Sequence, residues 1–265
     1  MTLQIQKIEV DGRPASLEQI WAMDLAHPTH FTAMQVRDGK TPGLGFHLTR
    51  LDAASQELFG VGLDGERVRG YIRHPLTGGP PDSSVRVHVF WSDADDDVRV
   101  VVSVRPPASA PDRAQNLQSM RYQRPLAHIK HGGGFGQSYF GGLAHGNGFD
   151  EALFVGPDGA ISEGSITNIG FIDGDSIVWP DAPALRGVMM QVLQRELTRA
   201  QVPWRYDAVR LSDLESPAGP FAGAFVTNSH GMAAVARIDD LTLPTESDLM
   251  RTAAELIRAA PLDPI

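Results

Sequence analysis

Residues 126 to 135 read Leu126-Ala-His-Ile-Lys-His-Gly-Gly-Gly-Phe135. The stretch contains Lys130, one of three lysines in a chain that has 20 arginines. Arginine serves where a permanent positive charge is enough, whereas only an amine can form a Schiff base. The three glycines leave room for a flat group against the backbone. Lys130 is therefore a candidate for a chemical role, although a surface lysine before a flexible loop is the simpler interpretation of this stretch alone.

Composition places the chain among ordinary globular proteins. Its 265 residues fit one large domain or two small ones, and 42% are hydrophobic while 21% are charged. No apolar run approaches the length of a membrane span, and the first residues lack the features of a signal peptide. We therefore expect a cytoplasmic protein without a membrane partner.

Charge and cysteine content exclude several functions. The absence of cysteine excludes disulfides, thiolate metal sites and a cysteine nucleophile. A formal net charge of -9 predicts no nucleic-acid partner, because no basic stripe is available for phosphates. His128, His131 and His145 lack a further ligand at a recognised spacing, so no metal is predicted. The expected ligand is a small molecule.

The first part of the chain predicts an α/β domain. Alternating residues indicate strands at 3–10 and 31–36, and near-helical spacing indicates a helix over 46–58. Two β-branched runs joined by an acidic turn predict a hairpin over 84–104. Proline and small residues at 106–112, followed by a polar run, mark a boundary. We expect an N-terminal domain at 1–112, a linker at 113–124 and a C-terminal domain at 125–265.

The C-terminal part also predicts a mixture of strands and helices. Short strands separated by tight turns are expected between residues 152 and 179, and again at 221–227 and 233–238. Helices are expected at 187–199 and at about 247–259, with Ser247 as the N-cap of the second.

The most specific motif lies downstream of Lys130. Residues 159 to 171 read Gly159-Ala-Ile-Ser-Glu-Gly-Ser-Ile-Thr-Asn-Ile-Gly-Phe171. They follow Asp150-Glu-Ala-Leu153 and precede a Gly-Val helix start at Gly187 and the triplet Thr227-Asn-Ser229. This order resembles the class IV aminotransferases. That fold-type IV family of pyridoxal-phosphate (PLP) enzymes includes branched-chain and D-amino-acid aminotransferases and aminodeoxychorismate lyase.

The resemblance extends from about Phe31 to Ile238 and implies a fold, a cofactor and an assembly. The implied fold has two α/β domains with PLP in the cleft between them, and the family suggests a homodimer. Lys130 is implied to form the Schiff base and to move the substrate's α proton. Glu163 is implied to face the pyridine nitrogen, where a carboxylate strengthens the ring as an electron sink.

Further residues are implied to bind the cofactor phosphate. The helix start at Gly187 has backbone N–H groups without intrahelical partners, which makes it an anion site. Thr227-Asn-Ser229 is implied to add donors from the other side. Arg50 matches the family's His-x-x-Arg-Leu helix, whose arginine contacts the phosphate. The predicted cofactor residues are Arg50, Lys130, Glu163, Gly187, Val188, Met189, Thr227, Asn228 and Ser229.

The expected activity is that of a PLP-dependent aminotransferase acting on a small amino acid or amine, with a keto acceptor. Phe135 and Met190 depart from the branched-chain pattern, and the acidic hairpin tip replaces a loop that binds the substrate carboxylate in several relatives. Arg105 or Arg121 is an alternative cation. Two other functions stay open: a lyase of the aminodeoxychorismate type, and a PLP-binding protein without catalytic turnover.

Overall fold

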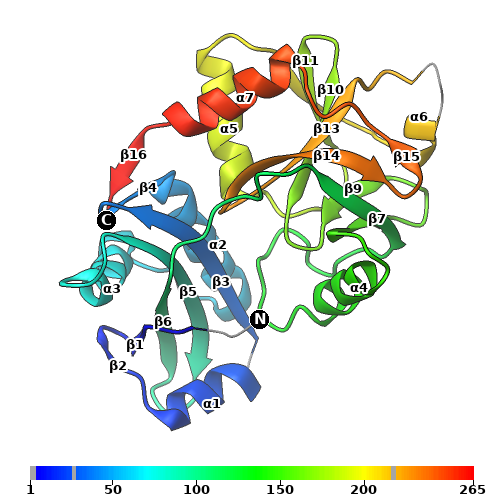
Figure 1. Ribbon diagram of the computed structural model, residues 1–265. Helices are drawn as coiled ribbons and strands as arrows, with labels where there is room; N and C mark the ends of the chain where they lie inside the picture. The colour runs from blue at the N-terminus through cyan, green and yellow to red at the C-terminus, as the bar shows by residue number, and fades with distance from the viewer. Residues whose placement is uncertain (1–3, 26–27, 216–218) are drawn as a thin grey trace. The chain divides into compact units, whose positions relative to one another are not determined.

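The computed structural model describes residues 4–25, 28–215 and 219–265. The chain forms two compact units, each with helices and one β-sheet (Figure 1). The first unit comprises Met1–Ala108, Ile129–Gly133 and Pro261–Ile265, and the second comprises Ser109–His128 and Gly134–Ala260. No helix in the described ranges is both long enough and apolar enough to cross a membrane.

A seven-stranded antiparallel sheet forms the first unit, in the order β16-β4-β3-β5-β6-β1-β2. Its strands are β1 (Lys7–Val10), β2 (Arg13–Pro14), β3 (Thr29–Arg37), β4 (Lys40–Pro42), β5 (Asp82–Ser92), β6 (Asp97–Arg105) and β16 (Leu262–Pro264). Its helices are α1 (Leu17–Leu25), α2 (Leu44–Phe59) and α3 (Gly65–Leu76). The predicted hairpin is confirmed, because β5 and β6 pair along their length.

The two faces of strand β5 have different surroundings. Val85, Val87 and Val89 are fully buried in a core cluster that includes residues of α2 and α3. Side chains alternate along a strand, so Arg86 and His88 lie on the opposite face. One face of the sheet therefore holds the larger core cluster of this unit, and the other carries polar side chains beside a smaller cluster that includes Phe90 and Val101.

Helix α2 confirms the helix predicted over residues 46–58. Its buried residues recur at a spacing of three or four, at Leu44, His47, Leu51 and Ala54. The helix ends at Gly60, whose φ of 72° lies in the left-handed region that glycine adopts without strain. Asp64 begins α3, because its side chain accepts hydrogen bonds from two backbone N–H groups of the first turn.

A nine-stranded mixed sheet forms the second unit, in the order β12-β11-β10-β13-β14-β7-β8-β9, with β15 paired to β14. Its strands are β7 (Gln115–Arg121), β8 (Glu151–Val155), β9 (Ile161–Gly164), β10 (Asn168–Asp173), β11 (Ser176–Pro180), β12 (Trp204–Asp207), β13 (Gly223–Asn228), β14 (Gly231–Ile238) and β15 (Leu241–Thr242). Its helices are α4 (Phe135–Gly146), α5 (Val188–Arg199), α6 (Leu211–Glu215) and α7 (Asp248–Ala259). Helices α5 and α7 confirm the two predicted helices, and Ser247 is the N-cap of α7.

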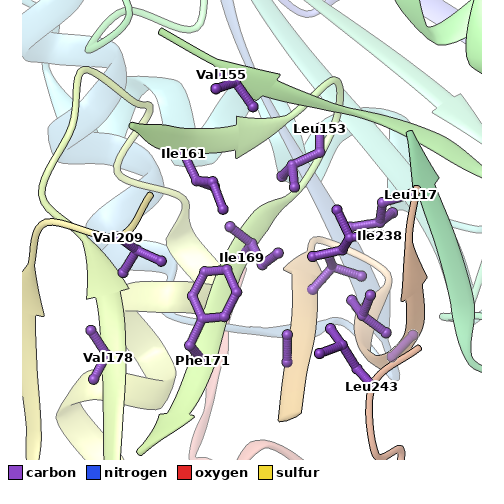
Figure 2. Close-up of a cluster of buried hydrophobic side chains, with 14 residues drawn as sticks. Leu117, Leu153, Val155, Ile161, Ile169, Phe171, Val178, Val209, Ile238 and Leu243 are labelled. Atoms are coloured by element: carbon purple, nitrogen blue, oxygen red, sulfur yellow. The ribbon is translucent and has the colours of Figure 1, made fainter. Parts of the chain in front are cut away.

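Both faces of this sheet are buried. On one face Ile169 and Phe171 of β10 pack with Leu153 and Ile161, as Figure 2 shows. Ile172 belongs to a separate cluster, together with apolar residues of α5 and α7. Burial on both faces explains why β10 reads as a nearly continuous apolar run. This rigid sheet positions the segments on either side of β10.

Two details differ from the expected division of the chain. Residues 115–121, expected in the linker, form strand β7 between β14 and β8. The strand has few apolar residues, so backbone pairing with two neighbours stabilises it more than its own composition suggests. Residues 129–133 and 261–265 belong to the first unit, since His131 forms a bridge with His30 and β16 pairs with β4.

Candidate active site

Lys130 is attached to strand β3 of the first unit. The backbone N–H of Phe31 donates to the Lys130 carbonyl at 2.8 Å, and the Lys130 Nζ lies 4.8 Å from the centroid of the Phe31 ring. Such a position over an aromatic face stabilises a cation. A Cβ at Gly132 would overlap Thr29 Oγ1. The room that we attributed to a flat ligand is therefore filled by Thr29 at this glycine, and that interpretation of Gly132 is wrong.

Arg50 on α2 is held by two polar side chains. It donates through Nη2 to Thr32 Oγ1, and this oxygen lies 2.6 Å from His47 Nδ1. Burial lowers the pKa of His47 well below its usual value, and the charges of Arg50 and Lys130 lower it further. His47 is therefore neutral, and it shares a hydrogen bond with the Thr32 hydroxyl through Nδ1. Burial also lowers the pKa of Arg50 to about 10.

Glu163 on β9 forms a buried ion pair in the second unit. Arg124 Nε donates to Glu163 Oε1 at 2.9 Å, and both side chains are less than a tenth exposed. Arg124 also donates to the Ala127 carbonyl, and the Leu185 N–H donates to Glu163 Oε2 at 3.0 Å. A carboxylate has about four acceptor positions, so Glu163 retains capacity for a further donor.

The start of α5 is fixed by Asn168. Asn168 Nδ2 donates to the Leu185 carbonyl at 2.6 Å, and a Cβ at Gly187 would overlap Asn168 Oδ1. Only glycine therefore fits at this position without displacing the amide. The N–H groups of Val188 and Met189 precede the first intrahelical bond, which Gln191 donates to the Gly187 carbonyl.

The triplet 227–229 lies at the end of β13. Thr227 is directly opposite Asn168 on β10, and its buried Oγ1 has no hydrogen-bond partner among the described residues. Asn228 Oδ1 accepts a hydrogen bond from the His230 N–H at 2.8 Å, and Ser229 lies in the following turn. An unpaired buried hydroxyl is unfavourable unless a ligand or water contacts it.

The predicted site residues divide between the two units. Lys130 and Arg50 belong to the first. The second contains Glu163, Gly187, Val188, Met189, Thr227, Asn228 and Ser229. The second unit thus combines a buried carboxylate, a helix N-terminus and an orphaned hydroxyl around the segment 185–187.

Sequence reasoning missed the residues that hold these groups in place. Arg124 gave no signal, because it is an isolated arginine 39 positions before its partner Glu163. Thr32 was given no role, and His47 appeared only as part of the family's His-x-x-Arg-Leu helix motif. Glu151, which is buried, was quoted in a motif without a role.

The chain belongs to the class IV aminotransferase family. Residues 29–238 match the sequence profile described as amino-transferase class IV. This confirms the family predicted from the motifs. Comparison with curated protein sequences finds no match.

Solved structures with this fold include several aminotransferases. A PLP-bound hypothetical aminotransferase from Mycobacterium tuberculosis is 19% identical, with a TM-score of 0.80 over 97% of this chain and 98% of that chain. The branched-chain aminotransferase of Escherichia coli is 16% identical, with a TM-score of 0.82 over 97% and 95%. A putative 4-amino-4-deoxychorismate lyase from Legionella pneumophila is 16% identical, with a TM-score of 0.79 over 88% and 91%. The predicted α/β fold of type IV is confirmed, and the place of a cofactor between the domains stays a prediction.

Proposed function

We propose that the protein is a PLP-dependent aminotransferase that acts on a carboxylate-bearing amino donor through Lys130. The observation that carries the proposal is the arrangement around Leu185, whose N–H is bound by Glu163 and whose carbonyl is bound by Asn168. These two contacts join the proposed pyridine-binding carboxylate to the helix start proposed to bind phosphate.

The described residues fit PLP on three independent features. Thr227 Oγ1 is buried without a hydrogen-bond partner among the described residues, and the first N–H groups of α5 have no acceptor within the helix. Both features suit a phosphate. Arg50 Nε is also buried without a hydrogen-bond partner in the described chain. The Glu163 carboxylate, its charge compensated by Arg124, suits a protonated ring nitrogen.

Each residue then has a defined task. When bound, PLP supplies an aldehyde carbon and a protonated ring that accepts an electron pair. Lys130 would bind this aldehyde through its amine. Once the substrate's amine has displaced it, the freed Nζ would move the proton from the substrate's α carbon to the former aldehyde carbon of the cofactor. Glu163 holds the proton on the ring nitrogen. In the second unit the phosphate would be held by Thr227, Asn228, Ser229 and the N–H groups of Gly187, Val188 and Met189. Arg50 of the first unit stays a predicted phosphate ligand from the family's helix motif.

A carboxylate on the donor is supported by two arginines of the first unit, one of which shares an aromatic neighbour with Lys130. Arg86 lies 5.8 Å from the centroid of the Phe31 ring, over which the Lys130 amine also lies. Arg105 is near enough for its charge to lower the pKa of Arg86, after burial as the larger cause. Neither arginine forms an ion pair with a carboxylate of the described chain, so this sheet face carries positive charge that an anionic substrate compensates.

Single-turnover chemistry tests the proposal and distinguishes an aminotransferase from a lyase. A lyase is the second candidate because a putative lyase has the same fold. The purified protein is loaded with PLP and mixed with single amino acids or amines, without a keto acid. An aminotransferase releases one equivalent of keto acid and stops with its cofactor as pyridoxamine phosphate. Sustained pyruvate release from aminodeoxychorismate contradicts the proposal, as does a protein that gains no visible absorption band with PLP. Lys130→Ala is the control that should not show the band.

A further inference from the structure

A buried carboxyl group lies beneath the turn that connects β9 to β10. Glu151, at the start of β8, accepts hydrogen bonds at Oε1 from the Ile166 N–H at 2.6 Å and the Thr167 N–H at 3.1 Å. Its Oε2 lies 3.1 Å from Thr167 Oγ1. The proposed reaction does not use this group. A carboxyl at such a buried position would destabilise the fold if it had no hydrogen-bond partner.

The turn is shaped around this carboxyl. A Cβ at Gly164 would overlap both Glu151 Oε1 and Thr167 Oγ1. The Gly164 N–H donates to the Thr167 carbonyl at 2.9 Å, which closes the turn. Only glycine allows the backbone to approach the carboxyl so closely. The residues of the turn are therefore matched to the group below them.

The same turn separates two residues of the candidate site. Glu163 immediately precedes the turn, and Asn168 immediately follows it. Each binds Leu185, one through its N–H and the other through its carbonyl. A displacement of the turn therefore moves the carboxylate proposed for the ring nitrogen and the segment that leads to Gly187 together.

We propose that Glu151 is a positioning residue for the cofactor site, acting through the turn of residues 164–167 on Glu163 and Asn168. The inference rests on the proposed PLP function. Glu151 touches neither cofactor nor substrate in this role. It keeps the two ends of the turn at the separation that Leu185 requires.

The neutral form of Glu151 is compatible with this role. The groups that contact the carboxyl from the turn are backbone N–H groups and hydroxyls, and the neighbouring Asp150 is paired with Arg113. Burial raises the pKa of Glu151 to about 7, against the opposing effect of these hydrogen bonds. With a proton on Oε2, the acid donates to Thr167 Oγ1 while Oε1 still accepts both N–H bonds. A glutamine amide reproduces that pattern.

The test compares PLP affinity among variants of the full chain. Glu151→Ala should weaken PLP binding to the apoprotein by about ten-fold or more, the change that ~1.4 kcal/mol produces. Glu151→Gln should remain within about three-fold of wild type, a difference below ~0.7 kcal/mol. Glu9→Ala is the matched control, because Glu9 is another buried carboxylate but is paired with Lys7 and His74 in the first unit.

The readouts are the dissociation constant from absorbance titration, the position of the visible band and the melting temperature. The proposal is overturned if Glu151→Ala and Glu9→Ala change PLP affinity equally at equal loss of melting temperature, or if the glutamine variant binds as poorly as the alanine variant. Should Glu151→Ala not fold, Thr167→Val removes only the hydroxyl contact and should weaken PLP binding while the melting temperature stays near wild type. Wild-type protein that binds no PLP would instead contradict the proposed function.

Discussion

Removing the Arg124 side chain should destabilise the protein strongly. Arg124 and Glu163 form a buried pair, with Nε and Oε1 2.9 Å apart. Breaking a buried pair by removing one partner costs about 3–5 kcal/mol, because the other charge stays buried without compensation. Arg124→Met also loses the hydrogen bond to the Ala127 carbonyl, worth about 1 kcal/mol. We expect a loss of roughly 4–6 kcal/mol in the free energy of unfolding.

A double-mutant cycle measured by urea denaturation tests this reasoning. Glu163→Gln removes the charge and keeps an oxygen for the Leu185 N–H, so Arg124→Met combined with it should be more stable than Arg124→Met alone by about 1–2 kcal/mol. Arg113→Met is the control, because Arg113 is mostly exposed in its pair with Asp150 and its removal should cost far less stability. If Arg124→Met costs no more than this control, or if the two changes at the pair are additive, the pair does not hold Glu163 as described.

Three further predictions follow from other contacts. Gly187→Ala should displace the Asn168 amide, break its bond to the Leu185 carbonyl and weaken PLP binding by about ten-fold, as measured by absorbance titration of the apoprotein. Arg86→Met should raise KM for an amino acid donor by about ten-fold or more with a smaller change in kcat, whereas an unchanged KM would remove Arg86 from substrate binding. Glu151 has a pKa raised to about 7 in the folded protein against about 4.5 when unfolded, so the folded state binds its proton more tightly. The bound proton therefore stabilises the folded state fully below about pH 4.5, and this stabilisation of about 3 kcal/mol is lost as pH rises through 7. Glu151→Gln has no such proton to lose, so its free energy of unfolding, measured by denaturation across this pH range, should not show this decrease.

The elements that sequence could predict have local signals. The helix at 247–259 has an N-cap serine, the helix at 46–58 has regular apolar spacing and a terminal glycine, and the hairpin at 84–104 has β-branched strands around a polar tip. Strand β7 has no such signal, because its place depends on β14 and β8, which come much later in the chain. Its alternation of buried and half-buried residues becomes meaningful only once those partners are known.

The candidate site shows the same limit. Lys130, Glu163 and Gly187 were predicted because an amine, a carboxylate and a helix start follow one another in a family order. Arg124 and Asn168 hold the last two in place, and their contacts join residues 39 and 17 positions apart. Spacing along the chain gives no measure of such a contact, since it depends on which strands become neighbours.

The glycines after Lys130 show why a residue type alone does not reveal its cause. Gly132 is required because Thr29 Oγ1 occupies the space that a Cβ would need. Gly133 has open space around it but a φ of +64°, so backbone conformation is the reason there. Gly134 precedes α4, where a Cβ would lie 2.9 Å from Gln137 Oε1. The three adjacent glycines thus have three different structural causes: a side chain of strand β3, a backbone angle and a side chain of helix α4. The glycine run after Lys130 therefore reflects close neighbours at two positions and a backbone angle at the third, and space for a ligand has to be established from the groups around it.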